Sequence, residues 1–502
     1  MIRADASTQM GTGHVMRCLA LAQAMKVQGR SAYFAIVSCP PVLSERLENE
    51  GFMVHCLASV EAGSSKDAQE TADLFYRLQC QWVCVDGYQF GANYQEILKK
   101  LGCRSLFLDD YGHASFYSAN LVLNQNSSAH DRYYQHRHCE TKLLLGLRYT
   151  LLRQEFLNSR KTQRCIPEVV RNILITLGGS DPKNVTTWIL DSLQKIQILG
   201  LTITVIVGAA NPHRKSLEAC VTRSIYPIQL VWNAINMSDH IADADLAISA
   251  GGSTVWELLM LGLPSIIVTL ADNQVAIAQS LHEQEVSVSL GSYHQLESTQ
   301  LVSAVQKMGT SLEQRQKMSA RGQGLIDGDG CDRALMAMEG NRIRLRRAKW
   351  QDCDQIWQWA NEVETRQSSF QSDAISWGHH VNWFQAKLQD VNCHIWIAFD
   401  RHDQPIGQVR FDPLSTDVTQ ISLSIDRSYR HQGLGQTILK AAIRNIFCKT
   451  AFCSISAWIK SDNIASISVF ESVQFVKIKT EYRGSEIAFH YQLRKPVKEE
   501  VG

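Results

Sequence analysis

Two series of short apolar runs, each interleaved with helix-length segments, constrain the fold of this chain most. The first series contains SAYFAIVS (31–38), QWVCVDGY (81–88), RSLFLDDY (104–111) and ANLVLNQN (119–126). The second contains RNILITLGGS (171–180), LTITVIVG (201–208), DLAISAGG (245–252) and LPSIIVTLA (263–271). Apolar runs of this kind are typical of parallel strands that helices cover on both faces. The sequence therefore predicts an α/β protein with two doubly wound, Rossmann-like halves.

Changes in composition mark the expected domain boundaries. A polar segment that carries Pro167 separates the two series, so we expect an N-terminal half over residues 1–157 and a second half over 171–340. Seven of the 11 tryptophans follow Arg347. This shift indicates a third domain of different architecture, an α+β domain over 342–496.

Charge and composition exclude several classes of protein. The 502 residues include 50 Lys and Arg against 49 Asp and Glu, a balance that does not favour nucleic-acid binding. The arginine cluster at 342–347 is more typical of a solvated strand edge. No apolar run approaches the roughly 18 residues that span a bilayer, so we expect no membrane insertion. The 14 cysteines are scattered without Cys-x-x-Cys spacing, which indicates a cytoplasmic protein with reduced thiols and no metal site.

A glycine loop near the N-terminus is the first candidate ligand site. Gly11 and Gly13 precede a helical pattern, so backbone amides at the start of that helix are open to a polar or anionic ligand. His14 begins the helix, where the helix dipole disfavours imidazolium and leaves a neutral ring that can accept a proton from water. Arg17, one turn later, shares its face. The alternative is that His14 is an ordinary polar cap.

A second strand-loop-helix junction repeats this geometry. A buried-type strand leads into Gly251, Gly252, Ser253 and Thr254, whose amides are placed to hold a diphosphate. Glu257 then suits the hydroxyls of a ribose. The alternative is structural, because Thr254 to Glu257 also has the spacing of a capping box.

An earlier loop is expected to be structural. In the loop at 178–182, Asp181 is placed as a helix N-cap with Pro182 at the first helical position.

The first two domains resemble a known family through several motifs together. They are RADASTQMGTGHVMRCLALA (3–22), VDGYQF (85–90), LDD (108–110), NQN (124–126), LGGSDPKN (177–184), AGGSTVWELLMLGLP (250–264) and LADNQ (270–274). In this order they resemble the GT-B-like UDP-sugar hydrolases of pseudaminic acid biosynthesis. Those enzymes release UDP from UDP-2,4-diacetamido-2,4,6-trideoxy-β-L-altropyranose.

The resemblance implies roles for individual residues. It implies that His14 is the general base for water, in a metal-independent reaction that inverts the anomeric carbon. Tyr88 and Asn273 match residues of the sugar pocket, with Tyr88 placed among the catalytic residues, and Gln274 lies beside them. Glu257 matches the ribose contact, while Gly13 and Arg17 fall in the substrate-binding motif. The family places a strand before this motif, and here only Met1 and Ile2 precede it, so we expect a short first strand or a start that is internal.

The third domain has its own glycine loop. Arg430, Gly433 and Gly435 follow the strand-like run QISLSID (420–426), and Asn463 opens a later amphipathic stretch. In this order the residues resemble the acetyl-CoA-binding motifs of GNAT N-acetyltransferases, which implies that these four residues hold acetyl-CoA. A glycine-rich turn in an unrelated α+β domain is the alternative.

The third domain departs from the GNAT pattern at the residue expected to act as the acid. GNAT enzymes commonly have a tyrosine that protonates the departing thiolate, and this chain has Phe470 there. A phenyl ring cannot donate a proton. The usual Gly-Phe ending of this motif reads Gln474 and Phe475. The sequence therefore predicts acetyl-CoA binding with slow transfer, unless another residue supplies the proton.

Together these motifs predict a bifunctional enzyme. The GNAT domain would acetylate the 4-amino group of a UDP-linked amino sugar, and the first two domains would then free the diacetamido sugar from UDP. One alternative is a glycosyltransferase that uses a sugar acceptor in the same cleft. Another is a non-catalytic UDP-sugar-binding protein.

Overall fold

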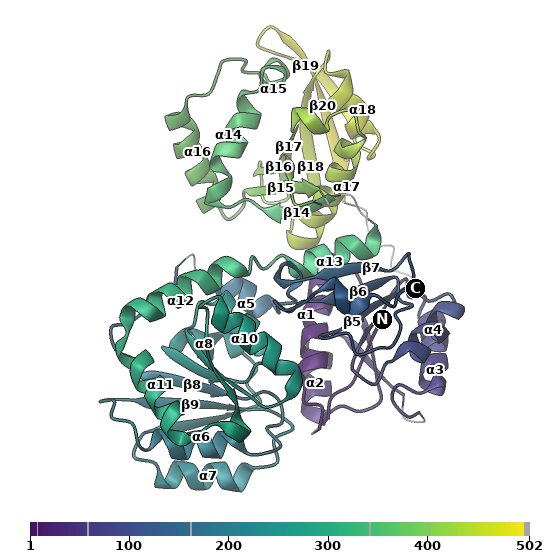
Figure 1. The fold of residues 1–502 in the computed structure, drawn as a ribbon. Coiled ribbons are helices and arrows are strands. Elements are labelled where there is room, and N and C mark those ends of the chain that lie inside the picture. Colours follow the sequence, from purple (N-terminus) through teal and green to yellow (C-terminus); the bar gives the residue numbers. More distant parts are fainter. Residues whose placement is uncertain (8, 58–59, 161–162, 341–342, 401, 496–502) are drawn as a thin grey trace. The chain divides into compact units, whose positions relative to one another are not determined.

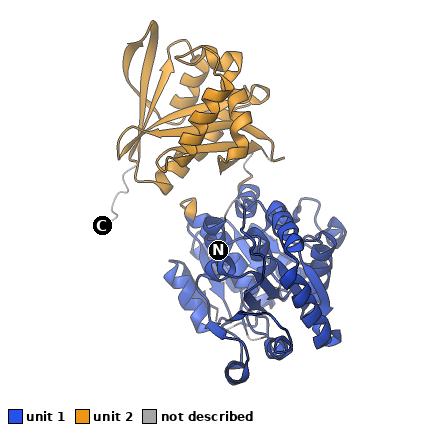
Figure 2. Ribbon diagram, turned by 90° about the vertical axis from the view of Figure 1, so that its left-hand side faces the viewer, with its two compact units in different colours: residues 1–26, 30–338 blue, residues 27–29, 339–502 orange. Residues whose placement is uncertain are grey.

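The computed structural model describes residues 1–7, 9–57, 60–160, 163–340, 343–400 and 402–495. The expected limits of the third domain, residues 342 and 496, and Arg342 of the arginine cluster therefore lie outside the described residues. The chain divides into two compact units: residues 1–26 with 30–338, and residues 27–29 with 339–502 (Figure 2). The first unit contains both Rossmann-like halves.

The N-terminal half, drawn in purple and blue in Figure 1, is built on a parallel sheet. This sheet has seven strands in the order β3-β2-β1-β4-β5-β6-β7. Its strands are β1 (Ile2–Ala4), β2 (Tyr33–Ile36), β3 (Met53–Cys56), β4 (Val83–Asp86), β5 (Ser105–Leu108), β6 (Leu121–Asn124) and β7 (Lys142–Leu145). Its helices are α1 (Gly13–Val27), α2 (Pro41–Asn49), α3 (Ser65–Arg77) and α4 (Ala92–Lys100), with short 3-10 turns η1 (Asp131–Tyr134) and η2 (Leu147–Tyr149).

Helices cover both faces of this sheet because neighbouring strand residues point in opposite directions. Phe34 and Cys84 pack in one apolar cluster with α1 and α2, whereas Ala35 and Val85 pack in another with α3 and α4. Strand β1 lies at the centre, between β2 and β4, although it has only three residues. This agrees with one of the two expectations from the sequence, namely that the first strand is short.

The second half repeats the design with a six-stranded parallel sheet, order β10-β9-β8-β11-β12-β13. Its strands are β8 (Asn172–Thr176), β9 (Thr202–Val207), β10 (Ile228–Trp232), β11 (Leu246–Ser249), β12 (Ser265–Thr269) and β13 (Val288–Ser292). Its helices and turns are α5 (Gln154–Ser159), α6 (Val185–Leu193), α7 (Arg214–Arg223), α8 (Met237–Asp243), α9 (Thr254–Met260), η3 (Asp272–Gln274), α10 (Val275–Glu283), η4 (Tyr293–Gln295), α11 (Ser298–Thr310), α12 (Leu312–Leu325) and α13 (Gly330–Glu339).

Helix α13 follows the second half in sequence but packs on the first. Its apolar residues Cys331, Ala334, Leu335 and Met338 belong to the same buried cluster as α1. The chain therefore returns to the N-terminal half before the third domain begins.

The third domain contains a seven-stranded mixed sheet, order β14-β15-β16-β17-β18-β20-β19. Its strands are β14 (Ile343–Arg347), β15 (His394–Asp400), β16 (Pro405–Pro413), β17 (Val418–Ile425), β18 (Ser454–Lys460), β19 (Val476–Arg483) and β20 (Glu486–Arg494). Its helices and turns are η5 (Trp350–Asp352), α14 (Cys353–Asn361), α15 (Val363–Gln367), α16 (Trp377–Gln389), η6 (Arg427–Tyr429), α17 (Leu434–Lys449) and α18 (Ile464–Glu471). Two parallel-sheet halves followed by an α+β domain confirm the predicted fold class.

Candidate functional site

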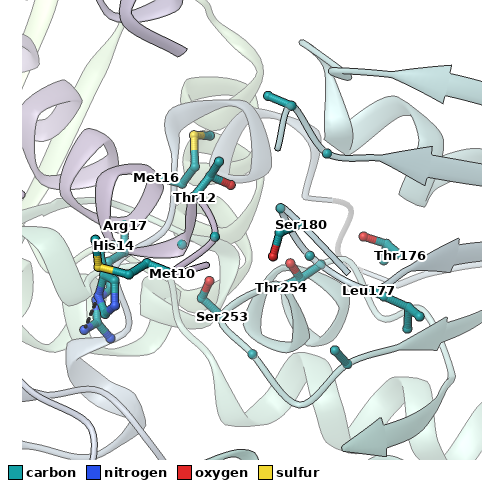
Figure 3. Close-up of a pocket in the computed structure, with 18 of the residues that line it drawn as sticks. Met10, Thr12, His14, Met16, Arg17, Thr176, Leu177, Ser180, Ser253 and Thr254 are labelled. Carbon is teal, nitrogen blue, oxygen red and sulfur yellow. Dashed lines mark hydrogen bonds between the residues drawn. The ribbon is translucent and has the colours of Figure 1, made fainter. Parts of the chain in front are cut away.

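A cavity of about 930 Å³ lies between the two halves of the first unit. Its wall is formed by loops that follow the carboxyl ends of strands, where ligands bind in open α/β sheets. The lining segments include residues 9–14, 176–182, 206–209, 249–254, 270–271 and 273–274. In Figure 3, His14 and Arg17 come from the N-terminal half, while Ser180, Ser253 and Thr254 come from the second half.

Glycine lets the loops of the two halves approach closely. A Cβ atom on Gly179 would lie 2.6 Å from Thr12 Oγ1, so a side chain there would collide with the first glycine loop. Gly13 lies opposite Ser253, since a Cβ atom on it would be 3.7 Å from Ser253 Oγ. The two predicted ligand loops therefore face one cavity.

His14 is held by a buried carboxylate that sequence analysis did not single out. Its Nδ1 lies 2.7 Å from Oδ1 of Asp86, the last residue of β4. A carboxylate only accepts hydrogen bonds, so in the neutral imidazole Nδ1 carries the proton and Nε2 has the lone pair. Burial alone would raise the pKa of Asp86, but Arg17 and His14 outweigh it and hold that pKa well below its usual range. His14 therefore has the tautomer of a general base.

Arg17 lines the cavity, but carboxylates occupy much of its guanidinium. Its Nε and one terminal nitrogen bond Asp86 at 2.5 and 2.7 Å, and the other terminal nitrogen bonds Asp110 at 2.7 Å. Its side chain is 7% exposed. Arg17 thereby joins Asp110 to Asp86, the carboxylate that bonds His14, and its predicted role in substrate binding stays a prediction.

Tyr88 links the two halves. Its hydroxyl donates to Asp110 at 2.7 Å and accepts from the side-chain amide of Asn273, in η3 of the second half, at 2.9 Å. Its ring stands edge-on to His14 with 5.0 Å between centroids. Burial and the Asp110 charge raise the pKa of Tyr88, so its hydroxyl stays protonated near neutral pH. The structure thus brings His14, Tyr88 and Asn273 together.

Glu257 does not form the capping box that was its structural alternative. Helix α9 has no side-chain hydrogen bond at its N-cap, Ser253. Instead the Glu257 carboxylate lies on the cavity wall and accepts from Arg153 at 2.9 Å. Burial raises the pKa of Glu257, and Arg153 opposes that shift. Arg153 is 5% exposed and also pairs with Glu155.

The remaining predicted residues of the second half also line the cavity. A Cβ atom on Gly251 would lie 3.0 Å from the Cβ of Gln274, so glycine is needed for this close approach. The Gln274 side chain accepts from the backbone amide of Leu270 at 2.9 Å and thereby holds its own loop. Gly252, Ser253 and Thr254 border the same space.

The loop at 178–182 has a structural role, but the predicted helix start is wrong. Helix α6 begins at Val185 and not at Pro182, and its N-cap is Asn184. Asp181 still bonds the amides of Val185 and Thr186, both at 2.9 Å. Residues 182–184, which were expected to begin the helix, instead belong to a turn. Asp181 and Asn184 have positive φ in this turn.

Sequence analysis missed Asp86, Asp110 and Arg153. Asp86 is the last residue of β4, and Asp110 follows the end of β5. These two strands are adjacent and parallel. Carboxyl ends of neighbouring parallel strands meet at one edge of the sheet, so their position was a usable signal. Arg153 carries no local pattern that could have pointed to it.

Three of the four predicted acetyl-CoA residues, Arg430, Gly433 and Gly435, lie around the start of α17. Gly433 has φ of +72° and is the N-cap of this helix, and a Cβ on Gly435 would meet Ile425 and Val469 at 3.2 and 3.3 Å. The Arg430 guanidinium, however, bonds Glu364 at 2.6 Å, the carbonyl of Ile425 at 2.9 Å, and Glu362. Arg430 therefore ties the loop to α15.

Asn463 is the N-cap of α18, and Phe470 lies within this helix. The Asn463 side chain accepts from the amide of Ser466 at 3.0 Å and caps this helix. Phe470 is 5% exposed and packs against Phe475 in the apolar core, with 5.0 Å between ring centroids. Both residues thus have structural contacts of their own.

Family models match two parts of the chain. Residues 342–476 match the acetyltransferase (GNAT) domain, and residues 172–329 match the glycosyltransferase family 28 C-terminal domain. The fold and these models together define two Rossmann-like halves, the second of which matches the glycosyltransferase family 28 C-terminal domain, followed by a GNAT acetyltransferase domain.

Individual relatives extend this result. The chain is 25% identical to the uncharacterized protein MJ1062 of Methanocaldococcus jannaschii, over 97% of this chain and 98% of that protein. It is 25% identical to the UDP-2,4-diacetamido-2,4,6-trideoxy-β-L-altropyranose hydrolase of Campylobacter jejuni, over 57% of this chain and 97% of that enzyme. A Helicobacter pylori protein named as both pseudaminic acid cytidylyltransferase and that hydrolase is 26% identical, over 51% of this chain and 44% of its own length. The two relatives named as the hydrolase confirm the predicted resemblance.

Within the described residues, no helix combines the length and apolar character needed to cross a bilayer. Nor do those residues contain a cluster of three or more His, Cys, Asp or Glu side chains arranged to hold a metal ion.

Proposed function

We propose that the first unit hydrolyses UDP-2,4-diacetamido-2,4,6-trideoxy-β-L-altropyranose to UDP and the free sugar. The observation that carries this proposal is the buried Asp86–His14 pair on the wall of the cavity. The relative from Campylobacter jejuni, which the chain aligns with over nearly all of that enzyme, supports the choice of substrate.

In the proposed reaction, His14 acts on water. Nε2 takes a proton from a water molecule, whose oxygen attacks the anomeric carbon from the side opposite UDP. The bond between the anomeric carbon and the diphosphate oxygen then breaks, with inversion and without a metal. Asp86 keeps the Nδ1 proton in place and stabilises the imidazolium that forms.

Residues of both halves would position the substrate. Glu257 would accept hydrogen bonds from the ribose diol, with Arg153 holding its carboxylate. Backbone amides of the 251–254 loop would face the diphosphate. Tyr88, Asn273 and Gln274 would border the sugar, and the Tyr88–Asn273 bond would keep the two halves together around it.

The GNAT domain is proposed to prepare that substrate. With acetyl-CoA as donor, it would acetylate the 4-amino group of a UDP-linked 4-amino-4,6-dideoxy sugar. The loop that contains Gly433 and Gly435 would offer backbone amides to the pyrophosphate, while Arg430 and Asn463 would hold the loop and α18 in shape. Acetylation would thus precede hydrolysis.

The decisive experiment is to incubate the purified protein with the UDP-diacetamido sugar and measure UDP and free sugar. Release of both in equal amounts without a sugar acceptor supports the hydrolase. Turnover only when an acceptor is added would instead indicate a glycosyltransferase, and tight binding without turnover would indicate a binding protein.

A further inference from the structure

The GNAT sheet opens into a wedge between β17 and β18. These strands pair in parallel at only three positions, of which the last joins Gln420 and Ser456. Beyond this point β17 continues to Ile425 beside β16, and β18 continues to Lys460 beside β20. The two strands therefore diverge, and Ser456 stands at the closed end of the wedge.

One face of the sheet beside the wedge is polar. Ile421 and Leu423 on β17 and Ile455 and Ala457 on β18 pack into the core or against it. Because side chains alternate along a strand, their neighbours lie on the opposite face. That face carries Gln408, Ser424, Ser456, Trp458 and His490.

Three atoms on this face are buried without a hydrogen-bond partner among the described residues. They are Gln408 Oε1, Ser424 Oγ and His490 Nδ1. A buried polar atom without a partner is costly and is uncommon in native proteins. Three of them on one face indicate that a polar ligand completes their bonding.

Ser456 and His490 form a pair at the closed end of the wedge. Ser456 Oγ lies 2.7 Å from His490 Nε2, and Ser456 is 3% exposed. The imidazole stacks on Trp458, with 4.4 Å between centroids and 7° between planes, which fixes the ring. The pair therefore offers a hydroxyl backed by a nitrogen that can accept its proton.

The charge around His490 favours a neutral ring. Burial, together with Lys479 and Arg483 on β19, lowers the pKa of His490 against the opposing effect of Glu481. On the other side, β18 presents Ser456 and Trp458 to the ring, and Lys460 further along is paired with Glu486. A neutral imidazole near pH 7 can take up a proton.

Carboxylates described around the wedge already have partners. Glu362 and Glu364 bond Arg430. Glu486 pairs with Lys460, and Asp426 accepts from the Trp359 indole. His490 is thus a better candidate than these carboxylates to accept a proton from the amine.

We propose that this polar face binds a primary amine and that the Ser456–His490 pair carries its proton during acetyl transfer. The proposal rests on acetyl transfer by the GNAT domain. The end of β17 at Ile425 and the closed end of the wedge are five residues apart, or about 17 Å at about 3.3 Å per residue. Gly435 lies against Ile425, since a Cβ atom on it would be 3.2 Å from that side chain. An extended thioester arm that starts at this loop would therefore bring its acetyl group to Ser456.

The proton balance of the step is as follows. An ammonium substrate first loses one proton to solvent. The neutral nitrogen then attacks the thioester carbonyl carbon and passes a proton to Ser456 Oγ, whose own proton moves to His490 Nε2. As the carbon–sulfur bond breaks, the same pair returns a proton to the departing thiolate. The products are the acetamide and the free thiol, and Phe470 need not supply an acid.

His490→Gln and Ser456→Ala test this assignment. Glutamine can still bond Ser456 but cannot take up a proton, and alanine removes the hydroxyl. With acetyl-CoA and a UDP-linked 4-amino-4,6-dideoxy sugar, both variants should lose about 10²- to 10⁴-fold in kcat at pH 7. Affinity for acetyl-CoA, measured by calorimetry, should change by less than about threefold, because the diphosphate loop is untouched.

A pH series separates proton transfer from a structural role. The loss in His490→Gln should shrink as the pH rises, because hydroxide then removes the proton without the pair. His379→Gln, an exposed histidine on α16 of the same domain, is the matched control and should behave like the wild type. A loss below threefold in both variants, or one that does not vary with pH, would overturn the assignment. Acetyl-CoA binding by the wild type without transfer to the amine would overturn the acetyltransferase proposal as well.

Discussion

Asp86→Asn offers a sharp test of how the proposed hydrolase site is built. Arg17 directs two donors at Asp86, so it would hold the oxygen of an introduced amide toward itself. The amide nitrogen would then face His14 and donate to Nδ1. That exchange moves the ring proton to Nε2, where it blocks proton uptake from water.

The size of the effect follows from the contacts that are lost. Where a carboxylate orients the catalytic histidine, holding that histidine in the wrong tautomer lowers kcat by about 10⁴. Loss of a general base lowers kcat by about 10² to 10⁴. We therefore expect kcat to fall by at least about 10². Breaking the buried pair with Arg17 should also cost about 3 to 5 kcal/mol of stability.

Stability also supplies a pH signature. The pKa of Asp86 lies below its ordinary value in the folded state. The ionised Asp86 side chain therefore makes its full contribution to the free energy of unfolding above the unfolded pKa of about 3.9. That contribution is lost as the pH falls through the folded pKa. The difference in unfolding free energy between wild type and variant should stay constant above about pH 4 and narrow below it.

The assay is release of UDP from the UDP-diacetamido sugar, with unfolding followed in parallel by circular dichroism. Asp67→Asn is the matched control, since Asp67 holds Arg3 in a buried pair of the same half and does not line the cavity. It should lose stability but keep kcat. If Asp86→Asn stays folded and retains more than a fifth of wild-type kcat, the tautomer argument is wrong.

Three further results are expected. His14→Asn should lower kcat by about 10² to 10⁴ with KM little changed, and more than a tenth of wild-type kcat would contradict its role as the base. Glu257→Ala should weaken UDP binding by about 1.5 to 3 kcal/mol and abolish the preference for UDP over 2′-deoxy-UDP; unchanged UDP affinity in calorimetry would leave Glu257 a purely structural partner of Arg153. Phe470→Tyr should raise acetyl-transfer kcat by less than threefold if Ser456 and His490 return the proton, and a larger gain would show that an acid was missing there.

Apolar runs predicted the sheets because a strand buried on both faces leaves a signal within its own residues. His14 and Glu257 could be singled out for a similar reason, since each lies in a helix that begins at a glycine or serine loop. The partners of these residues could not be predicted, because Asp86 is 72 positions from His14 and Arg153 is 104 positions from Glu257. For Arg430 the local motif could be recognised, but the position of its guanidinium could not be predicted. That position is set by Glu362 and Glu364, which lie more than 60 residues earlier in the chain.

The position of helix α13 limits where the chain can be divided between its two compact units. The side chains of Cys331, Ala334, Leu335 and Met338 complete the buried cluster around α1. A truncated chain that ends before residue 330 would therefore expose that cluster of the N-terminal half to water. The second half likewise cannot be excised without taking this helix away from its neighbour. A variant without the GNAT domain should therefore keep all of α13, through residue 339, whereas variants divided between the two Rossmann-like halves should yield insoluble fragments.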